Sequence, residues 1–207
     1  MAKNDVISVE NNITKKDFRK VFWRSFTLLG SFNYEKMEGL AYLYCIEHIL
    51  KKIYKDDEEG LKAAMLRESA AFNMTIAPAP FVMGISIAME ESVKRDPNFD
   101  PASINAIKVS LMGPLSGIGD TFFWGIFRIL ACSLSIGFAK AGNPIAPFIL
   151  LILFNIPTFL TRYYGLKIGY TSGNQLLIDL EKSGKMQLFD RKLGNCIMSF
   201  RIHNFRK

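Results

Sequence analysis

Two apolar runs in the middle of the chain constrain its fold more than any other feature. Thr121–Ala139 is nineteen residues long and contains one charge, Arg128, whereas Ile145–Leu160 is sixteen residues long and contains none. A helix needs about 20 apolar residues to cross a bilayer. The first run is therefore long enough, and the second is marginal unless it extends toward Leu166 or is shielded by neighbours. The two runs predict two membrane-spanning helices.

Basic residues dominate on both sides of these runs. The sequence has 26 Lys and Arg against 19 Asp and Glu, a formal net charge of +7. Basic proteins commonly meet nucleic acid or anionic lipid, and the accompanying apolar runs favour a lipid bilayer and no nucleic-acid partner. Basic flanks on both sides place both termini in the cytoplasm. The polar start, Met1–Asn12, lacks the apolar core of a signal peptide, which agrees with this topology.

An amphipathic helix is predicted after residues 1–13, which we expect to be disordered. Thr14 and Asp17 have the spacing of a capping box, which satisfies N–H groups at a helix start. Such a helix suits a membrane interface, and the alternative is an ordinary amphipathic helix docked on a soluble core. Its apolar face would carry Phe18, Val21, Phe22, Phe26 and Leu29, and its basic face Lys16, Arg19, Lys20 and Arg24.

Further helices are predicted on either side of a proline-rich break. The second helix is expected to begin near Tyr34. The prolines of Ala77–Pro80 must interrupt any helix, and the apolar stretch Phe81–Met89 is too short to cross a bilayer. Asp100 and Pro101 form a good helix start, because a carboxylate caps the helix and proline fits its first position. That helix is predicted to end at Met112.

Gly113–Asp120 is the most unusual stretch, with three glycines and a proline between apolar helices. It predicts an open, broken-helix element, and unwound backbone at membrane depth persists only when it is buried in protein or lines a wet cavity. Transporters hold polar substrates with such broken helices. The alternative is a tight helix–helix turn, since small residues also permit close packing. The stretch lacks the patterns of phosphate- and dinucleotide-binding loops.

Three residues are candidates for contacting a polar substrate: Asn33, Glu35 and Asp120. Amides and carboxylates can donate and accept hydrogen bonds with sugar hydroxyls. Asn33 and Glu35 cluster with Glu38 at the predicted start of the second helix, where simple capping is the competing explanation. Asp120 lies beside an apolar run, where ionisable groups usually pair or serve a pathway. For Arg128 we favour structural pairing.

No catalytic, metal-binding or cofactor-binding residues are predicted. His48 and His203 have no partner visible in the sequence, and a nucleophile needs an oriented base or acid beside it. Cys45, Cys132 and Cys196 lie far apart, which excludes a CxxC zinc or redox motif.

Several of these stretches together resemble the IID component of the mannose/fructose/sorbose family of sugar phosphotransferase systems. They are Lys15–Ser25, Ser31–Met37, Ile107–Asp120 and the pair Phe123-Trp124, in that order within about residues 14–185. The resemblance implies a helical membrane protein of the bacterial cell membrane that pairs with a IIC subunit. Together they would carry a hexose inward, where the IIA and IIB partners phosphorylate it. In that family the phosphoryl-carrying histidines belong to IIA and IIB, which implies that this chain is not an enzyme.

The end of the chain departs from that family, whose members continue with further apolar segments. Residues 188–207 are basic and contain no span, as in a truncated or frameshifted chain. The expected architecture is an all-α polytopic membrane protein with amphipathic interfacial helices and a broken-helix Gly/Pro element. Its IID-like membrane domain is residues 14–187, followed by the atypical tail. The rival interpretation is a truncated, non-transporting membrane module that at most associates with IIC.

Overall fold

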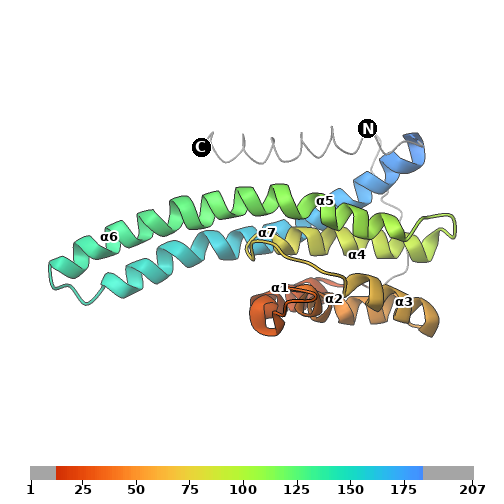
Figure 1. The fold of residues 1–207 in the computed structure, drawn as a ribbon, viewed down its shortest axis with the longest axis horizontal. Helices are drawn as coiled ribbons and strands as arrows, with labels where there is room; N and C mark the ends of the chain where they lie inside the picture. The colour runs from red at the N-terminus through yellow and green to blue at the C-terminus, as the bar shows by residue number, and fades with distance from the viewer. Residues whose placement is uncertain (1–12, 184–207) are drawn as a thin grey trace.

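A computed structural model of the protein describes residues 13–183, and within them the chain is helical, with isolated bridges as its only β structure (Figure 1). The predictions for residues 1–12 and for the tail 188–207 lie outside these residues. The all-α prediction is confirmed for the described part. Its helices, in chain order, are α1 (Lys15–Arg24), the 3-10 helix η1 (Ser25–Ser31), α2 (Gly39–Ile53), α3 (Glu58–Glu68), α4 (Ala79–Arg95), α5 (Ala102–Gly119), the π-helix η2 (Asp120–Phe127), α6 (Arg128–Lys140) and α7 (Ala146–Ser183).

A long hairpin forms the longest dimension of the molecule. One arm is the continuous helix α5–η2–α6 and the other is α7 (Figure 1). Both arms are apolar enough to cross a membrane, over Ala102–Lys140 and Ala146–Asn174, and only 17% of each apolar window is buried. A core helix of a soluble protein would bury most of that surface, whereas a lipid-facing helix leaves it exposed. The two predicted apolar runs each lie within a longer helix that is a candidate membrane span.

Helix α4 is the centre of the fold, because it packs along α7 on one side and against α2 on the other. Glycines allow α4 and α7 to approach at backbone distance. A Cβ on Gly169 would overlap the carbonyl oxygen of Phe81, and one on Gly173 would lie 2.7 Å from the Cβ of Ala88. The earlier residue of α7 meets the earlier residue of α4, and the later meets the later, so the two helices run parallel. Small residues favour such close packing in membranes.

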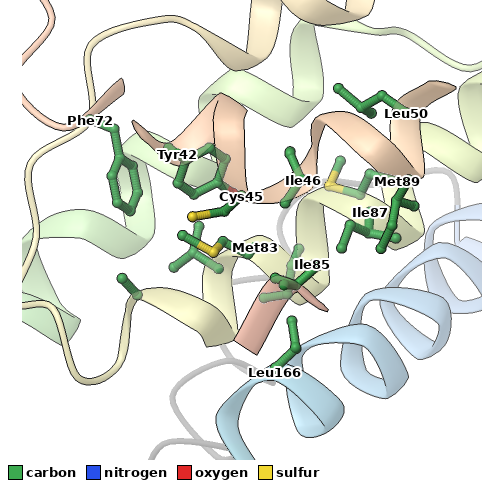
Figure 2. Packing of buried hydrophobic residues seen from close by; sticks show 14 of the residues in the cluster. Tyr42, Cys45, Ile46, Leu50, Phe72, Met83, Ile85, Ile87, Met89 and Leu166 are labelled. Atoms are coloured by element: carbon green, nitrogen blue, oxygen red, sulfur yellow. The ribbon is translucent and has the colours of Figure 1, made fainter. Parts of the chain in front are cut away.

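The hydrophobic core lies between α2 and α4, with α7 closing it from the opposite side of α4 (Figure 2). Helix α2 presents one apolar face at helical spacing, whereas α4 is buried nearly all round, as expected of a central helix. This explains the short apolar stretch 81–89, which is buried inside the protein. The core side chains labelled in Figure 2 are Tyr42, Cys45, Ile46, Leu50, Phe72, Met83, Ile85, Ile87, Met89 and Leu166.

The predicted capping box at the start of α1 is confirmed. The Asp17 carboxylate accepts hydrogen bonds from the backbone N–H and the hydroxyl of Thr14, both at 2.8 Å, and pairs with Lys52 at 2.7 Å. Burial alone would raise the pKa of Asp17, but these hydrogen bonds and the lysine charge outweigh it and lower the pKa to about 2. Helix α1 is amphipathic as predicted, with Val21 and Phe22 buried and most of the basic face exposed. It ends at Arg24, however, and Phe26 and Leu29, expected on the same apolar face, lie exposed in η1.

The predicted unwound element at Gly113–Asp120 is wrong. Residues 113–119 continue α5 with Pro114 inside the helix, and a π-helix begins at Asp120. The continuous helix keeps the backbone N–H and C=O groups of this stretch paired, as buried or apolar surroundings require. The Thr121 hydroxyl also donates to the carbonyl of Gly117 at 2.8 Å. The irregularity that glycine and proline suggested is present as the wider turn of η2.

The second helix begins at Gly39, five residues later than predicted. The side-chain oxygen of Asn33 accepts the N–H groups of Glu35, at 3.1 Å, and of Lys36, at 2.8 Å, which closes a turn. Met37 then adopts a left-handed backbone conformation, with φ of 51°, that a helix cannot continue from. Local side-chain hydrogen bonding has replaced the first helical turn.

Candidate functional site

A polar cluster lies where the segment before α4 crosses the C-terminal end of α5. We call it the polar crossing; it consists of Glu38, Thr75, Ser116 and Asp120. The Thr75 hydroxyl donates to Asp120 Oδ1 at 2.6 Å, and the Thr75 N–H donates to Ser116 Oγ at 3.1 Å. Thr75 is buried while Asp120 is exposed. The arrangement holds one carboxylate oxygen of Asp120 in place and leaves the carboxylate accessible from outside the chain.

Gly119 makes this crossing possible. A Cβ at Gly119 would lie 2.8 Å from the Cβ of Thr75, which is closer than side-chain carbons approach. The absence of a side chain there lets the loop backbone reach α5, as in other close approaches that require glycine. Gly119 therefore positions Asp120 by permitting close packing, although the tight helix–helix turn that was the competing explanation for the stretch is not present.

Glu38 closes the other end of the polar crossing. It is 2% exposed, and its Oε2 accepts the N–H of Met74, the residue before Thr75, at 3.3 Å. Burial raises the pKa of Glu38 to about 7, although the hydrogen bond from Met74 and the charge of Arg162 oppose the shift. A carboxyl group with this pKa can take up or release a proton near neutral pH. Met74 and Thr75 thus lie between two carboxyl groups, one buried and one accessible.

Asn33 and Glu35 lie in the turn before α2 and not in direct contact with Asp120. The Asn33 amide is used within the turn, since its oxygen accepts two N–H groups and its nitrogen donates to the Ser31 carbonyl at 3.1 Å. Glu35 is exposed. The turn reaches the polar crossing through the backbone, because Met37 bridges to Phe72 and the Glu38 N–H donates to the Phe72 carbonyl at 2.8 Å.

Two arginines lie on the spanning helices. Arg162 is buried on α7, where it donates to the carbonyl oxygen and the hydroxyl of Ser25 at 2.7 and 2.9 Å and so ties η1 to α7. Arg128 is exposed, and its guanidinium lies 5.3 Å from the centre of the Trp124 ring. Within the described residues Arg128 forms no ion pair with Asp120. The structural pairing expected for Arg128 is therefore not made inside this part of the chain.

The remaining reactive side chains of the described residues are half-buried or buried. His48 Nε2 lies 3.2 Å from the Asp17 carbonyl, its Nδ1 is buried without a hydrogen-bond partner, and burial lowers its pKa. Cys45 is buried and Cys132 is half-buried, while His203 and Cys196 lie outside the described residues. No group of three metal-ligating side chains occurs between residues 13 and 174.

Sequence reasoning missed Thr75, Ser116 and the burial of Glu38. Thr75 lies in a loop with no helical period, and it contacts residues 41 and 45 positions later. No local signal marks such a pair. Ser116 lies inside the glycine-rich stretch that the sequence analysis singled out. Its partner Thr75 is 41 residues away, so no local pattern predicts the contact.

The fold is that of a helical membrane protein built on two long apolar helices, each a candidate membrane span. Residues 12–199 of the sequence match the family model for the PTS system mannose/fructose/sorbose family IID component. The chain belongs to this family.

Relatives of known activity agree with this assignment. The mannose-specific EIID component of Escherichia coli (strain K12) is 36% identical over 180 residues, which are 87% of this chain and 64% of that protein. The fructose permease IID component of Bacillus subtilis (strain 168) is 36% identical over 171 residues, 83% of this chain and 62% of the relative. The chain thus spans less than two thirds of the length of these relatives.

A solved membrane assembly shares the fold. A cryo-EM structure of the mannose transporter ManYZ in complex with microcin E492 contains a chain that matches with a TM-score of 0.80 and 33% identity. The match covers 93% of this chain and 69% of that one. A second solved membrane protein matches with a TM-score of 0.74 and 32% identity. The hairpin and the helices packed on it are therefore an arrangement found in a membrane transporter.

Proposed function

We propose that this chain is the IID subunit of a mannose-type sugar transporter, which pairs with a IIC membrane subunit. The pair moves a hexose inward, and the IIA and IIB partners phosphorylate it. The observation that carries the proposal is the family match together with a structural likeness to a mannose transporter over 93% of the chain. The exposed apolar surface of both spanning helices supports the membrane location.

Asp120 is the residue through which we propose that this subunit contacts the sugar path. Its Oδ1 is fixed by Thr75, and no hydrogen bond to its Oδ2 is present within the described residues. A carboxylate held in this way is preorganised to accept hydrogen bonds from sugar hydroxyls. Glu35 is exposed and stays a candidate, whereas the hydrogen-bonding capacity of Asn33 is largely used in its own turn.

The test is sugar uptake and co-purification after co-expression with the cognate IIC subunit. We expect Asp120→Asn to co-purify with IIC as the unchanged chain does and to lose sugar uptake, because the fold needs only the hydrogen bond to Thr75, which an amide oxygen also accepts. Asp100→Asn is the matched control: Asp100 accepts the N–H of Ala102 at the start of the same helix, and asparagine caps a helix equally well. Loss of the complex in Asp120→Asn would make Asp120 a structural residue.

The same experiment separates transport from mere association. A chain that co-purifies with IIC but supports no uptake in its unchanged form would be the non-transporting membrane module. Phosphohistidine on His48 after incubation with phosphoenolpyruvate and the general phosphotransferase enzymes would contradict the non-catalytic assignment. We expect none, because the only hydrogen-bond partner of His48 in the described part of the chain is the Asp17 carbonyl, which cannot serve as the acid or base that a nucleophile needs.

We further propose that both termini are cytoplasmic and that the turn between α6 and α7 is external. Basic residues flank the two spans, and the turn around Asn143 lies at the far tip of the hairpin (Figure 1). Asn143→Cys should react with an impermeant thiol reagent added outside the cell. Labelling from the cytoplasmic side alone would reverse the topology.

A further inference from the structure

Arg128 is a charge exposed near the middle of the bilayer. It lies twelve residues before Lys140, which ends α6 at the tip of the hairpin, and at 1.5 Å per residue this places it about 18 Å from the tip. Half the hydrocarbon thickness is about 15 Å. The half of the hairpin that carries Arg128 projects beyond α1–α4 (Figure 1). An arginine at this depth is costly when lipid surrounds it, so such residues face protein or water.

No carboxylate of the described chain is available to neutralise Arg128. Between Pro101 and Asn174 the sequence has a single acidic residue, Asp120, which lies about two turns before Arg128 on the same helix and forms no ion pair with it within the described residues. The guanidinium of Arg128 is instead in contact with the exposed ring of Trp124, which stabilises a cation but does not neutralise it. In the part of the chain that the structure describes, Arg128 is therefore an exposed cation without a paired carboxylate.

The same helix offers a surface that another helix can approach closely. Gly113 and Gly117 are one turn apart on α5, and nothing lies within 4 Å of a Cβ built on either. Gly119, two residues further on, is in contact with Thr75 inside the chain. Glycines at a spacing of four favour close helix–helix contact in membranes. This pair is open in the isolated chain.

We propose that the exposed face of α5–η2–α6 docks a membrane helix of the partner IIC subunit, and that a carboxylate of that helix pairs with Arg128 at mid-bilayer depth. The inference rests on the proposed function and specifies where and by which charge the two subunits meet. A second copy of this chain fits less well. In two copies of the same topology, Arg128 of one copy lies at the same membrane depth as Arg128 of the other. The acid that each copy would offer, Asp120, lies two turns away along the helix and so at a different depth.

Arg128→Leu distinguishes docking from lipid exposure. A face in contact with lipid would gain from leucine, because an apolar side chain replaces a charge. A face docked on a carboxylate would lose, because the partner's acid is left buried and unpaired. We expect Arg128→Leu to reach the membrane at normal levels when expressed alone and to co-purify with IIC about ten-fold less or worse. Arg128→Lys should retain most of the complex.

Lys140→Leu is the matched control, since it removes a basic residue from the exposed end of the same helix. It should leave co-purification unchanged. The acid itself is then sought by changing each Asp or Glu in the IIC spans to Arg in combination with Arg128→Glu. Recovery of the complex by one such pair identifies the partner residue.

Each alternative result has a definite meaning. Normal co-purification of Arg128→Leu overturns the inference and leaves the proposed function intact. Recovery of Arg128→Glu by Asp120→Arg in this chain, and by no change in IIC, assigns the face to a second copy and also overturns it. If the unchanged chain fails to co-purify with IIC, the proposed function is wrong and this inference falls with it.

Discussion

The ion pair between Lys108 and Glu68 allows a quantitative test of what holds the hairpin to the peripheral helices. Lys108 Nζ donates to Glu68 Oε2 at 2.8 Å and to the Glu68 carbonyl at 3.3 Å, and it lies 4.3 Å from the centre of the Tyr42 ring. Both side chains are at most 1% exposed. The pair joins the first half of α5 to the end of α3, so its loss should loosen the spanning hairpin from the rest of the fold.

Lys108→Met removes the charge and keeps an unbranched apolar side chain of similar length. Breaking a buried pair by removing one partner costs about 3–5 kcal/mol, because the remaining charge is buried without compensation. Proteins of this size lose about 2–4 °C of Tm per kcal/mol, so the loss corresponds to roughly 6–20 °C. Removing both charges, in Lys108→Met with Glu68→Leu, should restore most of the stability.

The variant also has a predicted pH dependence. Burial raises the pKa of Glu68 above its ordinary value, and Lys108 opposes that shift, so removing the lysine raises the pKa further. A carboxyl whose folded-state pKa is raised binds its proton more tightly when folded, and its contribution to stability is lost as the pH rises through that pKa. Lys108→Met should therefore lose more stability between pH 6 and pH 8 than the unchanged chain loses.

The assay is the thermal loss of monodisperse protein in detergent, measured for the single and double variants at both pH values. A Tm of Lys108→Met within 2–3 °C of the unchanged chain, roughly one kcal/mol, would refute the reasoning. So would a double variant as unstable as the single one, since the cost would then come from lost packing and not from an unpaired charge.

Three further predictions use the same detergent assay. Gly169→Ala should destabilise the protein by about 1–3 kcal/mol or more, because the added Cβ overlaps the Phe81 carbonyl. Gly137→Ala, whose Cβ has nothing within 4 Å, should be neutral, and equal effects of the two would contradict close α4–α7 packing. Glu38, with a pKa of about 7 when folded against 4.5 as a free side chain, should contribute stability that falls between about pH 4.5 and 7, and Glu38→Gln should remove this slope. Asp17→Asn should lower the free energy of unfolding by about 1–2 kcal/mol at pH 7. The difference from the unchanged chain should vanish as the pH falls below about 2, where Asp17 itself is protonated. A difference that stays constant with pH would mean that the charge of Asp17 is not responsible.

Local sequence was sufficient wherever the determining interaction is local. The two spans follow from the apolar runs 121–139 and 145–160, since partition into lipid depends on the composition of each segment. The capping box of Thr14 and Asp17 follows from three residues of spacing. The stretch 113–120 shows the limit of such reasoning. The preferences of glycine and proline predicted an unwound element, whereas the structure continues helix α5 through Pro114 to Gly119.

The candidate site needed the tertiary structure. Asp120 was selected from sequence because it is an acid beside an apolar run, but its partner Thr75 is 45 residues away in a loop without a pattern. Asn33 was selected by the same chemistry, and the structure shows its amide used within its own turn. Side-chain type thus indicated which residues could bind a polar ligand and could not indicate which of them were already bonded.

By itself, the sequence determined the all-helical membrane class, the positions of the two long apolar helices and membership of the IID family, because each is encoded in segments or motifs that act independently of the rest of the chain. Only the tertiary structure decided that α4 is central, that Lys108 pairs with Glu68 and that Arg162 reaches Ser25, 137 residues earlier. These contacts join residues that the chain brings together only when the helices pack. Once the helices pack, a buried charge without a partner is costly because its surroundings are apolar, so the buried charged groups bond to one another or to polar groups beside them.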